Sequence, residues 1–181
     1  MNFIIKHFSE VDSTNSYLQK LALEGAAEGL VITTDFQTAG RGKPGRTWVS
    51  PKGKNLLFSI LLRPKVAANK APIVTQITCQ TVISVLKKYG LNAVPKRPND
   101  VLVDGKKICG VLTEASTKEN KIESVIVGIS LNVNAEQKEL IPEATSMKIL
   151  KNQEFSREEI LNDFLAQFEK DLHYNPNVGQ V

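Results

Sequence analysis

Apolar and polar residues follow one another in patterns that predict a mixture of strands and helices. Unbroken apolar and β-branched runs at 30–36 and 55–63 predict strands buried on both faces, because a half-exposed strand would alternate. A hairpin is expected at Asp104-Gly105, since this dipeptide supplies the positive φ angles of a tight turn. The predicted strands are 2–9, 30–36, 55–63, 93–96, 100–103, 107–115 and 122–133.

Helical spacing of apolar residues predicts three helices with recognisable ends. They run from the N-cap residues Asp12–Asn15 to Gly25, from Pro72 in a first turn to Gly90, and from the Ser156/Glu159 capping box to about Leu172. The tail 173–181 is expected to be frayed. Because no repeat, low-complexity tract or linker interrupts the pattern, the chain is predicted to be one mixed α+β domain covering residues 1–181.

The composition is that of a globular domain. With 181 residues, of which 41% are apolar and 23% charged, the chain is long enough to bury a core and too apolar to be disordered. No apolar run approaches the roughly 18 residues of a membrane helix, and Met1–Glu10 lacks the features of a signal peptide. Cys79 and Cys109 form no CxxC pair and are expected to be reduced, buried thiols. We therefore expect a cytoplasmic protein without a membrane segment.

The net charge of +4 conceals an asymmetric distribution. No Asp or Glu lies between Asp35 and Asp100, and this acid-free segment of 64 residues carries 12 of the 23 Lys and Arg side chains. The other 117 residues have a net charge of −8. Such asymmetry suggests an anionic partner, which could be nucleic acid, a nucleotide or an acidic surface.

A long loop at 38–54 holds the first candidate site. Loops of this length inside a domain are usually functional or disordered. Gly40–Gly45 formally matches the dinucleotide-binding pattern GxGxxG, but Pro44 interrupts it and no acidic residue follows about 20 positions later, so we reject that interpretation. The loop is then either a solvated basic hairpin or an anion site, in which backbone amides and cations bind phosphate or carboxylate oxygens. Its central cations are Arg41, Lys43 and Arg46.

Three further features have both a structural and a functional interpretation. Trp48, the single tryptophan, is either a packing anchor or a stacking surface for a base. The segment Lys96–Asp100 is either a proline turn or a strand end that presents an ammonium and a carboxylate group to a ligand. Asn132 and Asn134 either end a strand or project from one of its faces toward a nucleotide.

Common catalytic groups are poorly represented. His7 and His173 are the two histidines, and the sequence has no metal-binding His/Cys spacing, no nucleophile elbow and no recognisable catalytic triad. The chemistry is therefore expected to use cationic stabilisation rather than a protein nucleophile.

Taken together, these motifs resemble those of biotin protein ligases in order and spacing. The resemblance covers roughly Ser9 to Ala144. It is carried by the segments Asp12–Asn15, Gln37–Trp48, Ser50-Pro51, Gly53, Asn55-Leu56, Lys96–Asp100, Lys107–Leu112 and Gly128–Asn134. It implies a mixed β-sheet flanked by helices, related to the catalytic domains of class II aminoacyl-tRNA synthetases.

The resemblance also implies a two-step reaction. The carboxylate of biotin attacks the α-phosphate of ATP to give biotinyl-5′-AMP and pyrophosphate, and a lysine of a biotin carboxyl carrier protein then attacks the mixed anhydride. Fixed cations and Mg²⁺ would stabilise the charge on the phosphoryl oxygens, and no protein nucleophile is needed.

Motif positions imply roles for individual residues. Lys96 is expected to bridge the biotin carboxylate and the α-phosphate, with Arg41 and Arg46 as further catalytic cations, and Asp100 is expected to help position Mg²⁺. The implied biotin-binding residues are Ser13, Thr14, Asn15, Gln37, Gly40, Arg41, Gly42, Lys43 and Lys96, and the implied ATP-binding residues are Arg41, Arg46, Trp48, Asn99 and Asn132.

The chain departs from the family pattern at two positions. Lys43 stands where the family usually has Arg, and Arg97 where it usually has Trp. Because lysine lacks the bidentate fork of arginine, the intermediate is expected to be held less tightly. The motifs begin at Asp12, so neither the N-terminal DNA-binding domain of many bacterial members nor repression through DNA is expected. The small C-terminal β-barrel domain of most members is not expected either.

Three other interpretations stay open. A lipoate or octanoyl ligase of the same fold would usually carry an Arg-rich motif with consecutive glycines, which is absent here. A nonenzymatic nucleic-acid-binding module would use the acid-free segment but leaves the motifs around Gln37 and Lys96 unexplained. The third is an inactive biotin-binding relative. Because a strand edge could pair two subunits or receive the carrier protein, the sequence is compatible with a monomer and with a homodimer.

Overall fold

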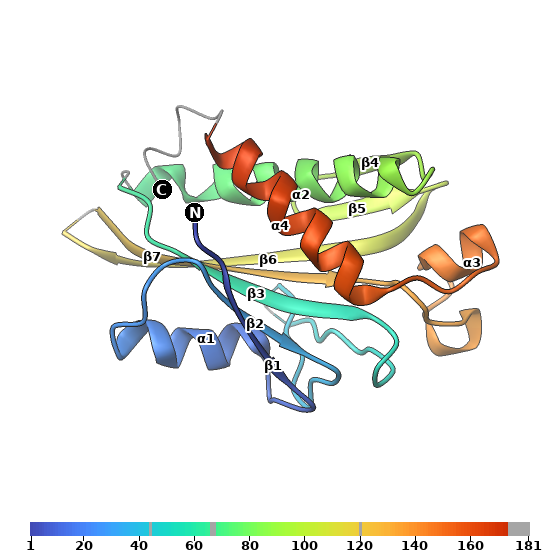
Figure 1. The fold of residues 1–181 in the computed structure, drawn as a ribbon, viewed down its shortest axis with the longest axis horizontal. Coiled ribbons are helices and arrows are strands. Elements are labelled where there is room, and N and C mark those ends of the chain that lie inside the picture. The colour runs from blue at the N-terminus through green and yellow to red at the C-terminus, as the bar shows by residue number, and fades with distance from the viewer. Residues whose placement is uncertain (44, 66–67, 120, 174–181) are drawn as a thin grey trace.

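The computed structural model describes residues 1–43, 45–65, 68–119 and 121–173. Within these ranges the strands form one seven-stranded sheet in the order β1-β2-β3-β7-β6-β5-β4, in which β1 and β2 run parallel and the other neighbours antiparallel (Figure 1). The strands are β1 (Ile4–Phe8), β2 (Leu30–Thr34), β3 (Leu56–Leu62), β4 (Ala93–Lys96), β5 (Asp100–Val103), β6 (Lys106–Lys118) and β7 (Lys121–Leu131). Each predicted strand is confirmed, with ends that differ by a few residues.

Helices cover both faces of this sheet. Figure 1 shows α1 on one side and α2 and α4 on the other, where α2 and α4 also pack against each other. The helices are α1 (Thr14–Leu23), α2 (Ala71–Lys88), α3 (Met147–Lys151) and α4 (Arg157–His173), with short 3-10 turns η1 (Ala68–Lys70) and η2 (Gln137–Glu139). None of the described helices is long and apolar enough to cross a membrane.

The position of β3 in the sheet explains why apolar and polar residues do not alternate along it. All seven of its residues are buried, because α1 covers one face of the strand and α2 and α4 cover the other. Phe58 and Ile60 belong to the large apolar cluster that contains residues of α2 and α4, whereas Leu61 belongs to the smaller cluster that contains Leu18 of α1. Successive side chains of β3 thus supply two separate cores.

The start of α1 differs from its prediction. Ser13 occupies the N-cap position, but its side chain makes no capping hydrogen bond. Instead, Asp12 Oδ1 accepts a hydrogen bond from the Ser13 amide at 2.7 Å, and Gln37 Oε1 accepts one from the Thr14 amide at 2.9 Å. A side chain from beyond β2 therefore completes the cap. As predicted, α1 gives way to Gly25, whose φ is +88°.

The other predicted boundaries are confirmed with one omission. Pro72 lies in the first turn of α2, and Asp104 and Gly105 have φ angles of +49° and +77° in the hairpin turn. The short helix α3 was not predicted, because five residues are too few to produce a helical period. Its start is capped by Ser146 Oγ, which accepts a hydrogen bond from the Ile149 amide at 3.2 Å. The frayed tail was predicted from 173 onward, but His173 is the last residue of α4. The rest of that tail, 174–181, and the loop residue Pro44 lie outside the described residues.

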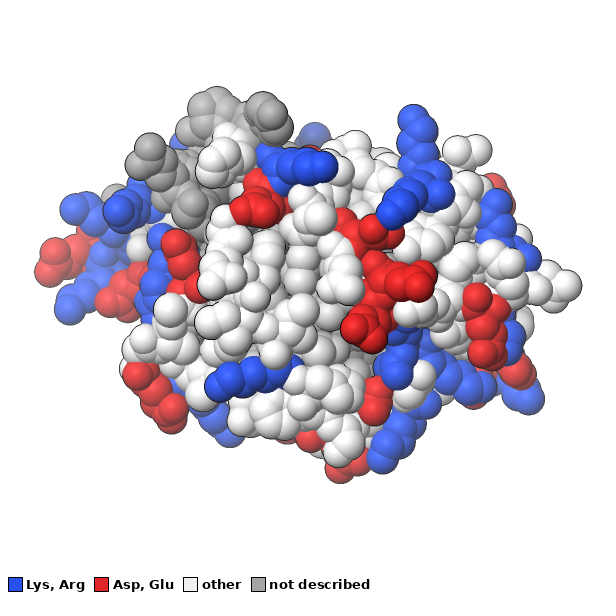
Figure 2. Space-filling model, viewed as in Figure 1, with Lys and Arg blue, Asp and Glu red and all other residues white. Residues whose placement is uncertain are grey.

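The acid-free segment does not give this face of the molecule a uniform charge. In the view of Figure 2, Lys and Arg side chains alternate with Asp and Glu side chains around a largely uncharged centre. Among the described residues, several charges are paired between elements, as in Lys88 Nζ to Asp163 Oδ1 at 2.6 Å between α2 and α4. Pairing of this kind is typical of an ordinary solvated surface.

We predict that replacing Phe168 with alanine destabilises the fold strongly. The Phe168 ring is fully buried in α4 and stacks on Phe164 with centroids 5.3 Å apart, so truncation loses apolar burial and leaves a cavity. The free energy of unfolding, measured by urea denaturation, should fall by about 3–5 kcal/mol. Leu23→Ala is the matched control, because that side chain is 81% exposed and its loss should cost less than about 0.5 kcal/mol. Equal losses in the two variants would contradict this account of the core.

Candidate functional site

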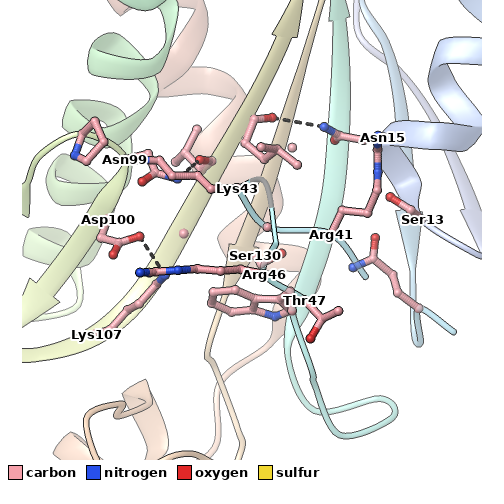
Figure 3. A pocket seen from close by; sticks show the side chains of 18 of the residues that line it. Ser13, Asn15, Arg41, Lys43, Arg46, Thr47, Asn99, Asp100, Lys107 and Ser130 are labelled. Atoms are coloured by element: carbon pink, nitrogen blue, oxygen red, sulfur yellow. Dashed lines mark hydrogen bonds and ion pairs between the residues drawn. The ribbon is translucent and has the colours of Figure 1, made fainter. Parts of the chain in front are cut away.

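A cavity of about 570 Å³ lies on the α1 side of the sheet, between the loop 38–54, the β4–β5 turn and the centre of β6 and β7 (Figure 3). Twelve of the fourteen sequence-predicted site residues line it, which are Ser13, Thr14, Asn15, Gln37, Arg41, Gly42, Lys43, Arg46, Trp48, Lys96, Asn99 and Asp100. Gly40 and Asn132 are the two that do not. Residues from five separate parts of the chain thus converge on one cavity.

Two glycines form the floor of this cavity. A Cβ atom on Gly128 of β7 would lie 2.1 Å from Asn15 Oδ1, and one on Gly110 of β6 would lie 2.9 Å from Trp48 Cζ3. Both contacts are closer than real Cβ atoms approach other atoms. The absence of side chains on the two strands therefore allows α1 and the loop to come close to the sheet.

One end of the cavity is polar and tightly hydrogen-bonded. Ser59 Oγ of β3 lies 2.6 Å from Asn15 Oδ1 and 2.7 Å from Thr14 Oγ1. Because an amide oxygen only accepts, Ser59 donates its single proton to Asn15 Oδ1. The single proton of Thr14 Oγ1 has two protein acceptors within reach, Ser59 Oγ at 2.7 Å and Gln37 Oε1 at 3.2 Å. The lone pairs of Thr14 Oγ1 then remain as acceptors, while Gln37, whose Oε1 is held by the Thr14 amide, keeps its NH₂ group as a donor.

Asn15 supports this end rather than offering groups to a ligand. Its Nδ2 donates to the Leu112 carbonyl at 3.1 Å and to Glu114 Oε2 at 2.8 Å, so both of its amide protons are used. Its Oδ1 accepts from Ser59, and the side chain is buried against Gly128. The predicted biotin-binding residue therefore lines the cavity with its hydrogen-bonding groups already occupied by protein.

The other end of the cavity is cationic, and it contains a lysine that was not among the predicted site residues. Lys107 Nζ lies 2.7 Å from Asp100 Oδ1 and 5.1 Å from the centroid of the Trp48 ring. Figure 3 shows Lys107 and Asp100 joined by this ion pair beside Arg46. The predicted hairpin turn at Asp104-Gly105 places Lys107 across from the segment that begins at Asp100, so the register was the signal that could have found it.

The β4–β5 turn serves the fold and the cavity together. Lys96 ends β4 as an exposed side chain, and Asn99 follows it in the turn. Asn99 Nδ2 donates to the Val111 carbonyl at 2.6 Å, and the Val111 amide donates back to the Asn99 carbonyl at 2.9 Å. These bonds attach the turn to β6. The segment is therefore a turn attached to β6 and also part of the cavity lining. Its binding of a ligand stays a prediction.

The loop 38–54 closes over the cavity as a small hairpin. The Gly42 amide donates to the Arg46 carbonyl at 3.0 Å, and the Trp48 amide donates to the Gly40 carbonyl at 2.9 Å. Gly40 is packed so closely that a Cβ atom there would lie 2.3 Å from the Trp48 carbonyl oxygen. It therefore shapes the loop from behind, while Arg41, Lys43 and Arg46 reach the cavity.

Asn132 has a structural setting outside the lining. Its side chain is 2% exposed, its Nδ2 donates to the Thr145 carbonyl at 3.0 Å, and its Oδ1 accepts from Asn55 Nδ2 at 3.1 Å. The backbone at Asn132 and Val133 also accepts hydrogen bonds from the first turn of α3. Asn132 thus attaches the segment after β7 to the sheet. This position agrees with the structural interpretation, in which Asn132 and Asn134 end a strand. Its role in ATP binding stays a prediction.

Neither cysteine is suited to nucleophilic chemistry. Cys109 of β6 and Cys79 of α2 are both buried and free. Burial raises the pKa of the Cys79 thiol to about 11, and burial together with the nearby Cys79 raises that of Cys109. Both thiols therefore stay protonated near neutral pH. This agrees with a cavity that acts through cations.

The carboxylate and amide at the β4–β5 turn fit a metal that arrives with a substrate. Among the described residues, no group of three His, Cys, Asp or Glu side chains lies close enough to hold a metal ion. Mg²⁺ is commonly bound by one or two carboxylates together with substrate phosphates. Asp100 is a carboxylate of this kind with Asn99 beside it, and its role in positioning Mg²⁺ stays a prediction.

Comparison with known proteins relates this cavity to one family. Residues 8–132 match the model of the biotin/lipoate A/B protein ligase family. The bifunctional ligase/repressor BirA of Bacillus subtilis is 34% identical over 165 residues, which cover 88% of this chain and 51% of that protein. The biotin–[acetyl-CoA-carboxylase] ligase of Paracoccus denitrificans is 35% identical over 131 residues, covering 69% and 52%. The chain thus spans about half the length of these curated relatives.

The fold agrees with these matches. The structure of the Aquifex aeolicus biotin protein ligase in complex with biotin and ATP superposes with a TM-score of 0.76 and 30% identity, covering 93% of this chain and 70% of that one. The expected mixed sheet flanked by helices is therefore confirmed. A family model that matches from β1 to the end of β7, together with this shared fold, establishes that the chain belongs to the biotin/lipoate A/B protein ligase family.

Proposed function

We propose that the chain activates biotin with ATP to biotinyl-5′-AMP and transfers the biotinyl group to a lysine of a biotin carboxyl carrier protein. The observation that carries this proposal is a single cavity with a hydrogen-bonding end and a cationic end. The Aquifex relative is a biotin protein ligase in complex with biotin and ATP, and the Paracoccus relative is a biotin–[acetyl-CoA-carboxylase] ligase.

The polar end matches the ureido ring of biotin in hydrogen-bonding capacity. A ureido ring has one carbonyl acceptor and two N–H donors. Thr14 Oγ1 offers lone pairs to an N–H group, and the NH₂ group of Gln37 and the hydroxyl group of Ser13 are donors for a carbonyl. These groups are largely buried, so a ligand that fails to pair with them would bind poorly.

The same polar groups favour biotin over lipoate, the second candidate that the family includes. The dithiolane ring of lipoate has no N–H and no carbonyl group. Binding it would leave the polar atoms of Thr14 and Gln37 without partners, and a site built to hydrogen-bond a substrate strongly rejects an analogue that lacks those groups.

The cationic end suits the first chemical step. A carboxylate oxygen forms a bond to the α-phosphorus, and the bond to the bridging oxygen breaks so that pyrophosphate leaves with the electron pair. Lys107 and Arg46 lie where two anions would have to approach each other, and fixed cations stabilise the charge that develops on the phosphoryl oxygens. In the second step the amine of the acceptor lysine attacks the acyl carbon and AMP leaves.

The bridging role that the resemblance implies for Lys96 remains part of this proposal, and we add Lys107 as a second cation of the same cavity. Lys107 is held between Asp100 and the face of Trp48, and its side chain is 29% exposed. Lys96 lies exposed on the edge strand β4. A cation that is already fixed in place loses little reorganisation energy in the transition state, so we propose that Lys107 adds to the stabilisation that Lys96 provides.

The activity is tested by incubating the protein with ATP, Mg²⁺, biotin and a biotin carboxyl carrier domain. We expect biotin to be attached to one lysine of the carrier, detected by mass spectrometry, because the cavity provides both binding ends. Lipoate is offered in a parallel reaction. Transfer of lipoate but not biotin would favour the second candidate, and binding of biotin without formation of an adenylate would identify an inactive relative.

Mutation can distinguish the contributions of Lys96 and Lys107 to adenylate formation. Lys96→Ala should lower the rate of biotinyl-AMP formation by at least about 10²–10³-fold, the usual effect of removing one stabilising group, while Lys107→Ala should lower it by a smaller factor. Lys106→Ala is the matched control, because that lysine is adjacent in sequence, exposed and outside the lining. Adenylate formation is followed in single turnovers. A larger loss in Lys107→Ala than in Lys96→Ala would move the bridging role to Lys107.

Because position 43 is a lysine, we predict that biotinyl-AMP dissociates measurably from the protein before transfer. A lysine at this position in the cavity gives a point charge where an arginine would give a bidentate fork. Lys43→Arg should therefore slow the release of biotinyl-AMP by roughly tenfold, measured with labelled biotin after a rapid desalting step. Lys52→Arg in the same loop, outside the lining, is the control. An unchanged rate of release in Lys43→Arg would contradict the idea.

A further inference from the structure

We propose that Glu114 of β6 is a positioning residue that holds Arg41, and with it the closing loop, against the sheet. The proposal rests on the proposed function only where it concerns the rate of adenylate formation. Glu114 Oε2 accepts a hydrogen bond from Arg41 Nη2 at 2.6 Å and another from Asn15 Nδ2 at 2.8 Å. Glu114 is neither in the cavity lining nor among the residues to which the sequence motifs assigned a role.

Arg41 needs such a partner because of where it lies. It is in the outer part of the loop 38–54, where the backbone hydrogen bonds of residues 40–43 and 45–48 connect the loop mainly to itself. Among the described cations of this hairpin, Arg41 is the one with a carboxylate partner, while Lys43 and Arg46 make no ion pair within the described residues. The bond to Glu114 is therefore the charged contact between the loop hairpin and the sheet.

Glu114 is itself rigidly placed. It lies on β6 opposite Ile126 of β7, near the middle of the longest strand pair in the sheet. The Asn15 amide that shares its oxygen is buried and is fixed in turn by Ser59 and by the Leu112 carbonyl. The position of Arg41 is thus determined through a short series of hydrogen bonds that begins in the core. Figure 3 shows the Arg41 side chain extended toward Asn15.

This arrangement leaves part of the guanidinium group available for a ligand. A guanidinium group has five N–H donors in a fixed plane. Glu114 takes a donor on Nη2, and this bond sets the orientation of the plane, so the remaining donors are directed by the sheet rather than by the loop. A carboxylate or phosphate oxygen entering the cavity would meet an arginine whose direction is already fixed, which lowers the entropy cost of binding the anion.

The contact is also a matter of charge. The side chains of Arg41 and Glu114 are 38% and 30% exposed, so the pair alone would stabilise the fold only modestly. An unpaired carboxylate close to an anion site would repel the substrate. Glu114 is paired with Arg41 and accepts a second hydrogen bond from Asn15, so its contacts are those of a group that orients Arg41. Since both bonds end on one oxygen, the amide oxygen of a glutamine can accept both, at reduced strength.

Mobility of the loop tests the proposal without any enzymatic assay. Trypsin cleaves after Arg41 and Arg46, so the rate of cleavage in the ligand-free protein reports how firmly the loop is held. We expect Glu114→Ala to be cut about tenfold faster than the unaltered protein, as when one charge-assisted hydrogen bond is lost, with Glu114→Gln between the two. Glu123→Ala, which removes an exposed carboxylate from neighbouring β7, should be cut at the normal rate. Equal rates in Glu114→Ala and Glu123→Ala would overturn the proposal.

A double-mutant cycle separates positioning from simple stabilisation of the sheet. Glu114→Ala should slow biotinyl-AMP formation by about tenfold in the unaltered protein and should have no further effect in Arg41→Ala, because the residue it positions is then absent. A role in sheet stability alone would lower the rate equally in both backgrounds, and that result would overturn the proposal. If no variant forms an adenylate, the proposed function fails, while the trypsin result still decides the role of Glu114.

Discussion

The contact between the Asn15 side chain and the bare backbone of Gly128 is the constraint on which the rest of the site depends. It brings the first turn of α1 down onto β7, where any side chain larger than hydrogen would collide with the amide. From this contact hydrogen bonds lead to Ser59 and Thr14 on one side and to Glu114 and Arg41 on the other. The polar end of the cavity and the closing loop are therefore positioned by one close approach of a helix to a strand.

Charge is organised around the same cavity. The loop and the β4–β5 turn come from the acid-free segment and supply cations to the cavity, and Lys107 of β6 adds another. Two carboxylates that lie outside this segment hold two of the cavity's cations in place. Asp100 pairs with Lys107, and Glu114 pairs with Arg41. Each carboxylate thus orients a cation of the cavity. Arg41, from the acid-free segment, and Lys107, from β6, thus each have a defined direction in the cavity.

The sequence predicted the strands, the three longer helices and most of the lining, because period, turn residues and clustered motifs are local signals. It did not identify Lys107 or Glu114, since both matter through partners that β-sheet pairing brings together. It also placed Asn132 in the site, although the side chain is used to attach the segment after β7. Capping of α1 by Gln37 was missed for the same reason, because the acceptor lies 23 residues from the amide it caps. Contacts between distant residues were the ones that local patterns could not supply.

The single proton of the Ser59 hydroxyl has a consequence for what the polar end can recognise. That proton is committed to Asn15 Oδ1, and the acceptors within reach of the Thr14 hydroxyl proton are Ser59 Oγ and Gln37 Oε1. Both hydroxyl protons are therefore used within the protein, which sets the order of donors and acceptors at this end of the cavity. The polar end of the cavity therefore has a fixed arrangement of hydrogen-bond donors and acceptors, which a ligand must complement in one orientation. A ring of the right size with its hydrogen-bond donors and acceptors exchanged would meet donor against donor, and shape alone would not let it bind.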